Sequence, residues 1–385
     1  MRTNTVLSVF SAELGPGLSA LSRASWRRQA LRYALGLVLL LRFRSVSELA
    51  RHLAGGAVDA LHHFLHDSPW DAQAAQRAEQ ERLARLARRD GRPIRLIIDD
   101  TPVERAGKKI EGLGVHHSAK GLVRGLCAVT AVVRLGGLVL AWAVRGYRAK
   151  RGCPAGEFRS KVDLAEEILS GATALGPDVT VLLDAWYTCK RILNRVTRQG
   201  WRYVAALKSN RLLVLDGRKT PVRHLAKGPR EYRTVRLSRR RKVRVARRLA
   251  VLPGVGQVAV FITKTGRKTK FLVSNDLELS AAAAVRLYAE RWSIETFHRE
   301  VKQHLGFGEL WVRSWRAVQR HWTLAAAAYN ALKLWNAARP ARERQRTFGQ
   351  IIRSFRRLIS TEQASLWCTR QARAARKVPN SSSQI

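Results

Sequence analysis

Two apolar runs end in aspartate and suggest metal-dependent chemistry. They are "IRLIIDD" at 94–100 and "VTVLLD" at 179–184. A carboxylate at a strand end lies at the rim of an open α/β sheet, where such folds place their reactive groups. Each aspartate alone would also suit a simple turn after a strand. Two such ends in a chain with 28 acidic against 71 basic residues instead favour carboxylates that bind hard divalent metals facing phosphate.

The segment 288–302, "YAERWSIETFHREVK", adds a third carboxylate among cations. At ~100° per residue, Tyr288, Arg291, Glu295 and Lys302 share a helical stripe about 60° wide. A solvated helix face would explain Arg291 and Glu295 as an i,i+4 ion pair. A face turned toward DNA also accounts for the tyrosine on the same stripe. In that interpretation Glu295 binds a metal ion, while the other three side chains hold phosphates.

The spacing Tyr-x2-Arg-x3-Glu-x6-Lys resembles the Y-R-E-K signature of insertion-sequence DDE transposases. "IIDDTP" resembles the first strand of that family, in which an aspartate precedes Thr or Ser, and this match favours Asp100 over Asp99. "VLLDAWY" resembles the second strand. The resemblance covers roughly residues 90–335. It implies that Asp100, Asp184 and Glu295 are the catalytic acids and the metal ligands.

The same resemblance implies an α/β fold, a ribonuclease-H-like mixed sheet with a β-rich insertion, flanked by N-terminal and C-terminal helical regions. It implies DNA cleavage with two divalent ions, Mg²⁺ or Mn²⁺ as its substitute, followed by joining of the freed 3′-hydroxyl to target DNA. The expected partners are transposon terminal inverted repeats and target DNA. Because two ends must be brought together, a homodimer is expected in the synaptic complex.

Two lysines are weaker candidates for phosphate contacts. Lys208 follows the strand expected at 201–210, and Lys120 lies in "HHSAKG". Single lysines are more often plain surface residues. The adjacent histidines of that motif, at 116 and 117, would point apart in a strand, so a structural or DNA-contact role is preferred to a metal pair.

Two other functions stay open on the sequence alone. The chain could be a catalytically inactive or repurposed DNA-binding protein. It could also be a ribonuclease-H-like DNA nuclease without joining activity, because a fold does not by itself define a reaction. The complete set of acids together with the intact signature favours catalysis.

The composition supports a polyanionic partner. The chain has 385 residues, a formal net charge of +43 and 46% apolar residues, which favours a folded nucleic-acid-binding protein. The four cysteines show no CxxC spacing and suit a reducing compartment. The apolar run at 33–41 is too short to span a bilayer, and no signal peptide is evident. We therefore expect a cytoplasmic, nucleoid-associated protein that has no membrane partner.

Local signals divide the chain into five regions. Ser45 with Glu48 forms a capping box, Ser68 before a proline is the expected start of a helix ending at Gly91, and Gly136-Gly137 predicts a hairpin. A single helix is expected at 280–304. The predicted regions are a helical DNA-binding domain (1–90), the first part of the catalytic core (91–210), a β-rich insertion (211–279), core helices (280–338) and a basic helical C-terminal region (339–385).

Overall fold

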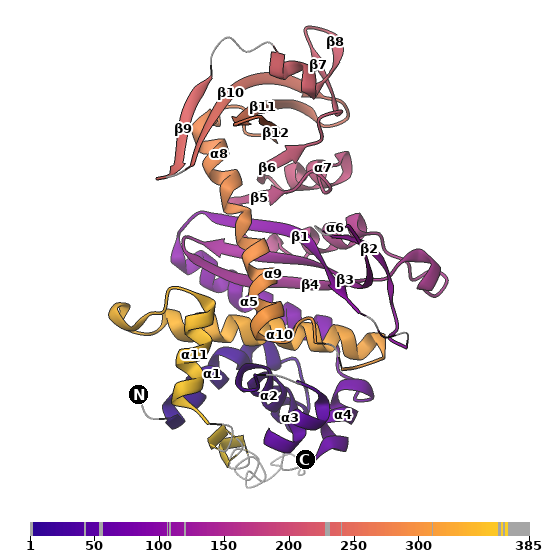
Figure 1. Ribbon diagram of the computed structural model, residues 1–385, viewed down its shortest axis with the longest axis vertical. Coiled ribbons are helices and arrows are strands. Elements are labelled where there is room, and N and C mark those ends of the chain that lie inside the picture. Colours follow the sequence, from indigo (N-terminus) through magenta and orange to yellow (C-terminus); the bar gives the residue numbers. More distant parts are fainter. Residues whose placement is uncertain are drawn as a thin grey trace, which may run out of the picture.

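The computed structural model has three tiers along its longest axis (Figure 1). The insertion forms the top tier, the first strands of the sheet form the middle tier, and helices form the bottom tier. Lys120 and the chain beyond residue 368 lie outside the described residues. The described residues are 3–41, 44–53, 57–105, 107, 109–118, 121–227, 232–239, 241–309, 311–360, 363–364 and 366–368.

The middle tier is a mixed sheet, as expected for a ribonuclease-H-like core. Strands β1, β5 and β6 run parallel to one another, and β3 pairs antiparallel with β1, β2 and β4. The predicted hairpin is confirmed, because β3 and β4 join at Gly136, which has a φ of 56°. The strands are β1 (Ile94–Glu104), β2 (Gly114–Ser118), β3 (Gly121–Leu135), β4 (Leu138–Tyr147), β5 (Val179–Leu183) and β6 (Arg202–Leu207).

The β-rich insertion continues the same sheet. Strand β12 pairs antiparallel with β6, so the order over the described residues is β2-β3-β1-β5-β6-β12-β11-β10-β7-β8, with β4 on β3 and β9 on β10. One connected sheet therefore joins the top and middle tiers. The insertion strands are β7 (Leu212–Leu215), β8 (Arg218–Pro221), β9 (Arg233–Ser238), β10 (Arg241–Leu252), β11 (Gly256–Thr265) and β12 (Lys268–Ser274).

Helices cover the sheet and build the bottom tier. No helix in the described part of the chain is long and apolar enough to cross a membrane. The helices are α1 (Thr3–Leu18), α2 (Ala24–Leu39), α3 (Val46–Leu53), α4 (Val58–His66), α5 (Ala72–Asp90), α6 (Lys161–Ser170), α7 (Lys190–Arg198), α8 (Ala281–Glu290), α9 (Trp292–His304), α10 (Trp315–Ala337) and α11 (Phe348–Leu358).

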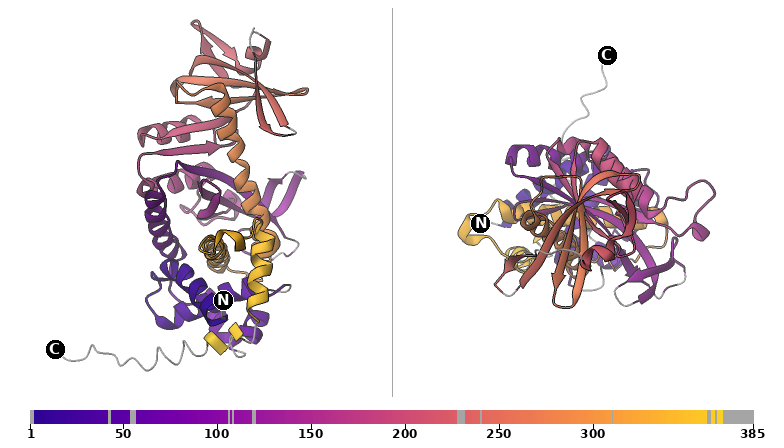
Figure 2. Two further views of the ribbon diagram at one scale, coloured as in Figure 1. Left: turned by 90° about the vertical axis from the view of Figure 1, so that its left-hand side faces the viewer. Right: turned by 90° about the horizontal axis from the view of Figure 1, so that it is seen from above.

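Two predicted helix boundaries are wrong. Helix α5 begins at Ala72, because the Asp71 carboxylate caps it by accepting from the backbone N–H groups of Gln73 and Ala74. The helix expected at 280–304 is divided at Arg291 into α8 and α9. The backbone there makes i to i−3 hydrogen bonds, from Arg291 N to Tyr288 O and from Ile294 N to Arg291 O, which tighten the turn. Figure 2 shows the two helices nearly in line.

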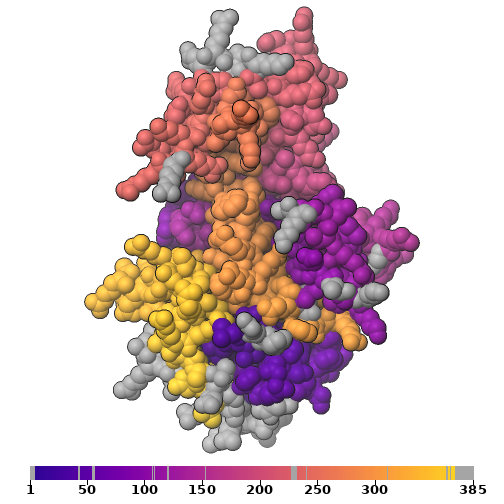
Figure 3. All heavy atoms as spheres, viewed as in Figure 1, coloured from indigo at the N-terminus to yellow at the C-terminus, as the bar shows by residue number. Residues whose placement is uncertain are grey.

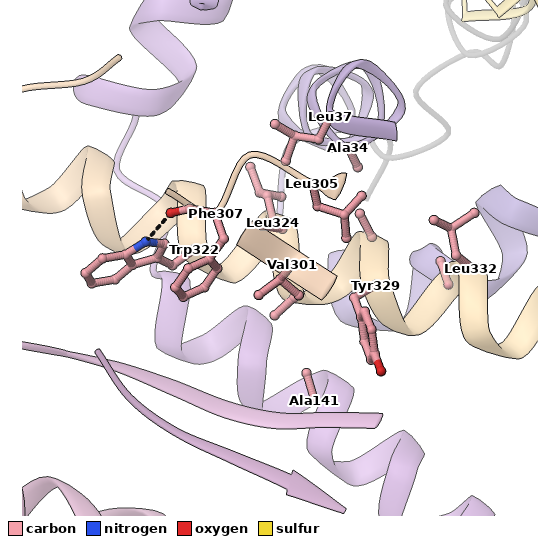
Figure 4. Packing of buried hydrophobic residues seen from close by; sticks show 14 of the residues in the cluster. Ala34, Leu37, Ala141, Val301, Leu305, Phe307, Trp322, Leu324, Tyr329 and Leu332 are labelled. Carbon is pink, nitrogen blue, oxygen red and sulfur yellow. Dashed lines mark hydrogen bonds between the residues drawn. The ribbon is translucent and has the colours of Figure 1, made fainter. Parts of the chain in front are cut away.

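The two faces of the sheet face different hydrophobic clusters. Ile97 of β1 packs into the cluster that contains α9 and α10, whereas Leu96 and Ile98 pack into the cluster that contains α6 and α7. Figure 4 shows the first cluster, in which Val301 of α9 lies among residues of α10 and α2, and the Trp322 indole donates to Phe307 O. Because side chains alternate along a strand, consecutive residues of β1 face different helices.

Candidate active site

The second strand-end acid, Asp184, lies directly after β5 in an anchored turn. Its carboxylate accepts from the backbone N–H groups of Trp186 (3.0 Å) and Tyr187 (3.1 Å), and its carbonyl accepts from the Thr188 hydroxyl (2.7 Å). Strands β1 and β5 are parallel and pair Ile98 with Leu183. The next residues, Asp99 and Asp184, are therefore neighbours on adjacent strands.

Arg291 connects Asp99 to the third predicted acid. The guanidinium donates to the Asp99 carboxylate at 3.0 Å and also forms an ion pair with Glu295. The same guanidinium lies 5.8 Å from the centre of the Tyr288 ring. The Asp99 and Arg291 side chains are 17% and 16% exposed, against 31% for Glu295. Hence β1 and α9 meet at an acidic cluster that a single cation bridges.

Burial perturbs the pKa values of both Asp99 and Asp184. Burial, and to a smaller extent the nearby Asp184 carboxylate, raise the pKa of Asp99 to about 7, although Arg291 opposes this shift. Burial also raises the pKa of Asp184, while the backbone N–H groups of Tyr187 and Trp186 lower it. Asp99 and Asp184 are half-buried, and their negative charges repel each other. A nearby cation therefore favours the ionised form of both carboxylates.

The structure does not bring Asp100 together with Glu295. Asp100 lies on the opposite face of β1, where its carboxylate forms an ion pair with Lys161 and accepts from the Tyr187 hydroxyl (3.1 Å). The Cys127 thiol lies 3.4 Å from the same carboxylate. Because side chains alternate along a strand, the sequence could predict that Asp99 and Asp100 point to opposite faces of the sheet. It could not predict which of the two faces α9 covers.

The other residues of the predicted signature lie near this cluster but make different contacts. The Lys302 ammonium donates to the backbone carbonyl of Pro102 in β1 (2.7 Å), and burial lowers its pKa. Tyr288 is half-buried, and burial raises its pKa. Lys208 is exposed, with its ammonium 5.2 Å from the centre of the Trp186 ring. Trp186 itself was not predicted from the sequence.

The donor chemistry of the cluster suits a hard divalent ion, because all three candidate ligands are carboxylates. Within the described ranges, however, no three His, Cys, Asp or Glu side chains are close enough together to hold a metal ion. Arg291 is the cation that pairs with Asp99 and Glu295 in this arrangement. Metal binding would therefore require the guanidinium to release these carboxylates.

Of the two roles predicted for His116, structural or DNA contact, its burial and its contacts suit the structural one. Its ring is 3% exposed and forms a hydrogen bond of 3.2 Å with Gly125 O, whereas His117 is exposed on the other side of β2. Trp322 is fully buried and packs edge-on against Trp315. Trp311, in contrast, is 56% exposed.

Comparison with known proteins assigns the chain to a family. A family model described as DDE superfamily endonuclease matches residues 16–252, which is more than half of the chain. The chain belongs to the DDE superfamily endonucleases. Members of this family generally use divalent metal ions. The match includes Asp99, Asp100 and Asp184, and it ends before the helix that carries Glu295.

The DDE endonuclease also resembles a curated protein from Microchaete diplosiphon. That relative is described as "Probable transposase for insertion sequence element IS701", and it is 25% identical over 189 residues. The aligned region covers 47% of this chain and 49% of the relative. The DDE endonuclease thus spans about half the length of the relative that it matches.

Proposed function

We propose that this DDE endonuclease is a transposase that binds the ends of an insertion sequence, cleaves the DNA there and joins the freed 3′-hydroxyl to target DNA. The observation that carries the proposal is the cluster formed where Asp99, in the middle of β1, lies beside the end of β5. Asp99 and Asp184 are neighbours there, and Arg291 links Asp99 to Glu295. The resemblance to a probable insertion-sequence transposase supports the same assignment.

Asp99, Asp184 and Glu295 are the proposed metal ligands, with Asp99 in place of Asp100. Asp99 is preferred because it faces α9, whereas Asp100 faces Lys161 on the other side of β1. The proposed ion is Mg²⁺, with Mn²⁺ as a substitute. Divalent ions bound by these carboxylates would supply activation of the attacking oxygen and stabilisation of the leaving oxygen.

Arg291 and Tyr288 are proposed to hold the DNA backbone at the cleavage site. In the DNA-free protein the Arg291 guanidinium neutralises two carboxylates. A phosphate group would offer the same fork-shaped hydrogen bonding to this guanidinium. The Tyr288 ring beside it limits the positions that the guanidinium can adopt. The Lys302 ammonium donates to Pro102 O, and Lys302 is proposed to position α9 against β1 close to the DNA backbone.

The proposed DNA surface extends from this cluster onto the insertion. Figure 3 shows α9 exposed on one face of the molecule, below the insertion, and α8 packs against the insertion strands β9 and β10. The insertion presents many cations to solvent, which suits phosphate contacts that are independent of sequence. Helical region 1–90 is proposed to recognise the ends, and a homodimer is proposed to hold two ends together. The exposed cations of the insertion, within the described residues, include Arg233, Arg236, Arg241, Lys242, Arg244, Arg248, Lys268 and Lys270.

A cleavage assay tests the proposed reaction. The protein is incubated with duplexes that carry the ends of its own element, in the presence of Mg²⁺ or Mn²⁺. We expect D184N to lose cleavage by at least roughly 100-fold while it keeps its affinity for DNA. D178N is the matched control, because Asp178 is an exposed aspartate that pairs with Arg202. Undiminished cleavage by D184N would remove Asp184 from the site.

A strand-joining assay separates the alternatives. Pre-cleaved ends with a free 3′-hydroxyl are mixed with supercoiled target DNA, and joined products are detected by a change in mobility. A transposase produces joined products that depend on the same acids as cleavage. Cleavage without joining would indicate a nuclease, and binding without either reaction would indicate a DNA-binding protein.

A further inference from the structure

Tyr187 makes hydrogen bonds with two aspartates from different strands. Its backbone N–H donates to the Asp184 carboxylate (3.1 Å), and its hydroxyl donates to the Asp100 carboxylate (3.1 Å). Asp184 follows β5, whereas Asp100 lies in β1 directly after Asp99. One fully buried side chain therefore connects the turn that contains Asp184 to the strand that contains Asp99.

The Asp100 carboxylate is held on both of its oxygens. Tyr187 donates to Oδ1, while the Lys161 ammonium pairs with Oδ2 and the Cys127 thiol lies 3.4 Å from Oδ2. The Lys161 ammonium is also 5.4 Å from the centre of the Tyr147 ring. The acceptor that the Tyr187 hydroxyl contacts therefore has a fixed orientation on the α6 side of β1.

A second buried tyrosine shows what packing achieves without such a contact. Tyr203 of β6 is 0% exposed, as Tyr187 is, and both belong to the same hydrophobic cluster. The Tyr203 hydroxyl has no hydrogen-bond partner within the described residues. Packing therefore holds a buried tyrosine in this cluster without its hydroxyl, and the bond from Tyr187 to Asp100 instead fixes the turn relative to β1.

The turn in its own right orients the Asp184 carboxylate. The backbone N–H groups of Trp186 and Tyr187 both donate to Oδ1 of Asp184, which leaves Oδ2 as the oxygen that can bind a cation. Any movement of Tyr187 therefore moves a donor of Asp184. Outer partners that orient a metal ligand in this way typically increase the affinity for the metal.

We propose that Tyr187 is a positioning residue for the proposed metal site. Its hydroxyl, held by Asp100, fixes the turn after β5 against β1. This contact sets the separation between Asp99 and Asp184, so that less freedom is lost when both carboxylates bind one ion. The ion pair of Asp100 with Lys161 supports the site from the opposite face of the strand. The inference rests on the proposed function, which takes Asp99 and Asp184 as metal ligands.

Amide hydrogen exchange of Y187F tests whether the hydroxyl holds the turn. The substitution removes one oxygen and keeps the ring, and the measurement uses the protein without DNA or metal. Exchange in peptides that contain residues 184–189 should be roughly tenfold faster than in the wild type, as expected for the loss of a hydrogen bond to a charged group. The matched control is Y203F, in which exchange of this segment should equal that of the wild type.

Titration calorimetry with Mn²⁺ on the DNA-free proteins tests the effect on the site. We expect Y187F to bind Mn²⁺ about tenfold more weakly than the wild type and Y203F to bind it equally well. In the cleavage assay, the Mn²⁺ concentration that gives half the maximal rate should rise by the same factor in Y187F. The maximal rate should fall by less than about threefold, because excess metal offsets weaker binding.

The proposal is overturned if Y187F exchanges this segment, or binds Mn²⁺, as the wild type does. Equal effects of Y187F and Y203F would also overturn it, because they would assign both hydroxyls to general packing. A lower maximal rate in Y187F with an unchanged Mn²⁺ requirement would do the same, because a purely structural role predicts that result.

The double variant D100L/K161M gives a second, independent test. It removes the acceptor of the Tyr187 hydroxyl without leaving an unpaired ammonium. Exchange of 184–189 should rise as in Y187F, and adding Y187F should cause no further increase, because both changes remove the same contact. Additive effects would overturn the proposal. Exchange and Mn²⁺ binding need no DNA, whereas a wild type that does not cleave the ends of its element would refute the proposed function alone.

Discussion

Asp99 and Asp100 are consecutive residues of β1, but their carboxylates pair with cations on opposite faces of the sheet. Asp99 pairs with Arg291 at the start of α9, and Asp100 pairs with Lys161 at the start of α6. Both side chains are about equally covered, at 17% and 16% exposed. Exposure therefore does not distinguish their roles, and the direction of each side chain does.

The first prediction compares D99N with D100N. D99N should lower cleavage by at least roughly 100-fold because it removes a proposed metal ligand. D100N should retain cleavage and destabilise the protein by about 1–3 kcal/mol, because the half-buried Lys161 ammonium loses its charged partner. Cleavage rates and urea unfolding of both variants provide the measurement. The reverse ranking of the two cleavage rates would restore Asp100 as the catalytic acid.

The second prediction concerns Arg291 and metal affinity without DNA. R291Q should bind Mn²⁺ at least about tenfold more tightly than the wild type, because a nearby unit charge repels a divalent ion by several kcal/mol even at an effective dielectric constant of roughly 20. Titration calorimetry on the DNA-free proteins measures the effect. The double variant R291Q/D99N should not show this increase in Mn²⁺ affinity, because it also lacks the proposed ligand Asp99. Equal Mn²⁺ affinity in R291Q and the wild type would contradict this account.

The third prediction concerns the buried Arg320 of α10. Its guanidinium is 4.6 Å from the centre of the Trp70 ring and connects α10 to the end of α4. R320M should lower the free energy of unfolding by on the order of 2–4 kcal/mol, because several carbonyls lose a charged donor. R316M at a neighbouring position is the control. The carbonyls that accept from Arg320 belong to Phe64, Leu65, Ser68 and Trp70.

The fourth prediction is a pH dependence of stability caused by His321. Burial lowers the pKa of His321 to about 4. The neutral ring accepts from the Tyr33 hydroxyl (2.7 Å) and donates to Gly306 O (2.9 Å). Below about pH 6.5, His321 takes up a proton in the unfolded chain but stays neutral in the folded protein until about pH 4.

The contribution of His321 is therefore complete above about pH 6.5 and is lost as the pH falls toward about 4. At roughly 1.4 kcal/mol per pKa unit, this loss amounts to about 3 kcal/mol. Chemical unfolding between pH 4 and 7 gives the free energy of unfolding at each pH. This free energy should rise more steeply with pH for the wild type than for H321Q. Parallel pH profiles for the two proteins would contradict the assignment.

Much of the local structure could be predicted from the sequence, because its signals act between residues that are close along the chain. Glycines mark the turn between β3 and β4, and Ser45 caps α3 through a hydrogen bond from Glu48 N. Apolar runs at 94–98 and 179–183 form the parallel strands β1 and β5. These signals predicted a mixed sheet and an aspartate after β5, but the strand end expected at Asp99 and Asp100 is wrong, because β1 continues to Glu104.

The start of α5 and the break between α8 and α9 were not predicted. At the first site the Asp71 carboxylate, and not the Ser68 hydroxyl, caps the helix. At the second site the helix breaks at Arg291, and the Arg291 side chain forms an ion pair with Asp99. Arg291 and Asp99 are separated by 192 positions, so no local pattern reports this contact.

The sequence by itself determined which residue types could carry the chemistry and which segments are strands or helices. Only the tertiary structure decided that Asp99 rather than Asp100 faces Arg291, that the insertion extends the core sheet through β12 and β6, and that the Tyr187 hydroxyl contacts Asp100. The physical reason is that strand pairing and helix packing join residues far apart in the chain. These contacts determine which of two opposite-facing side chains meets a partner.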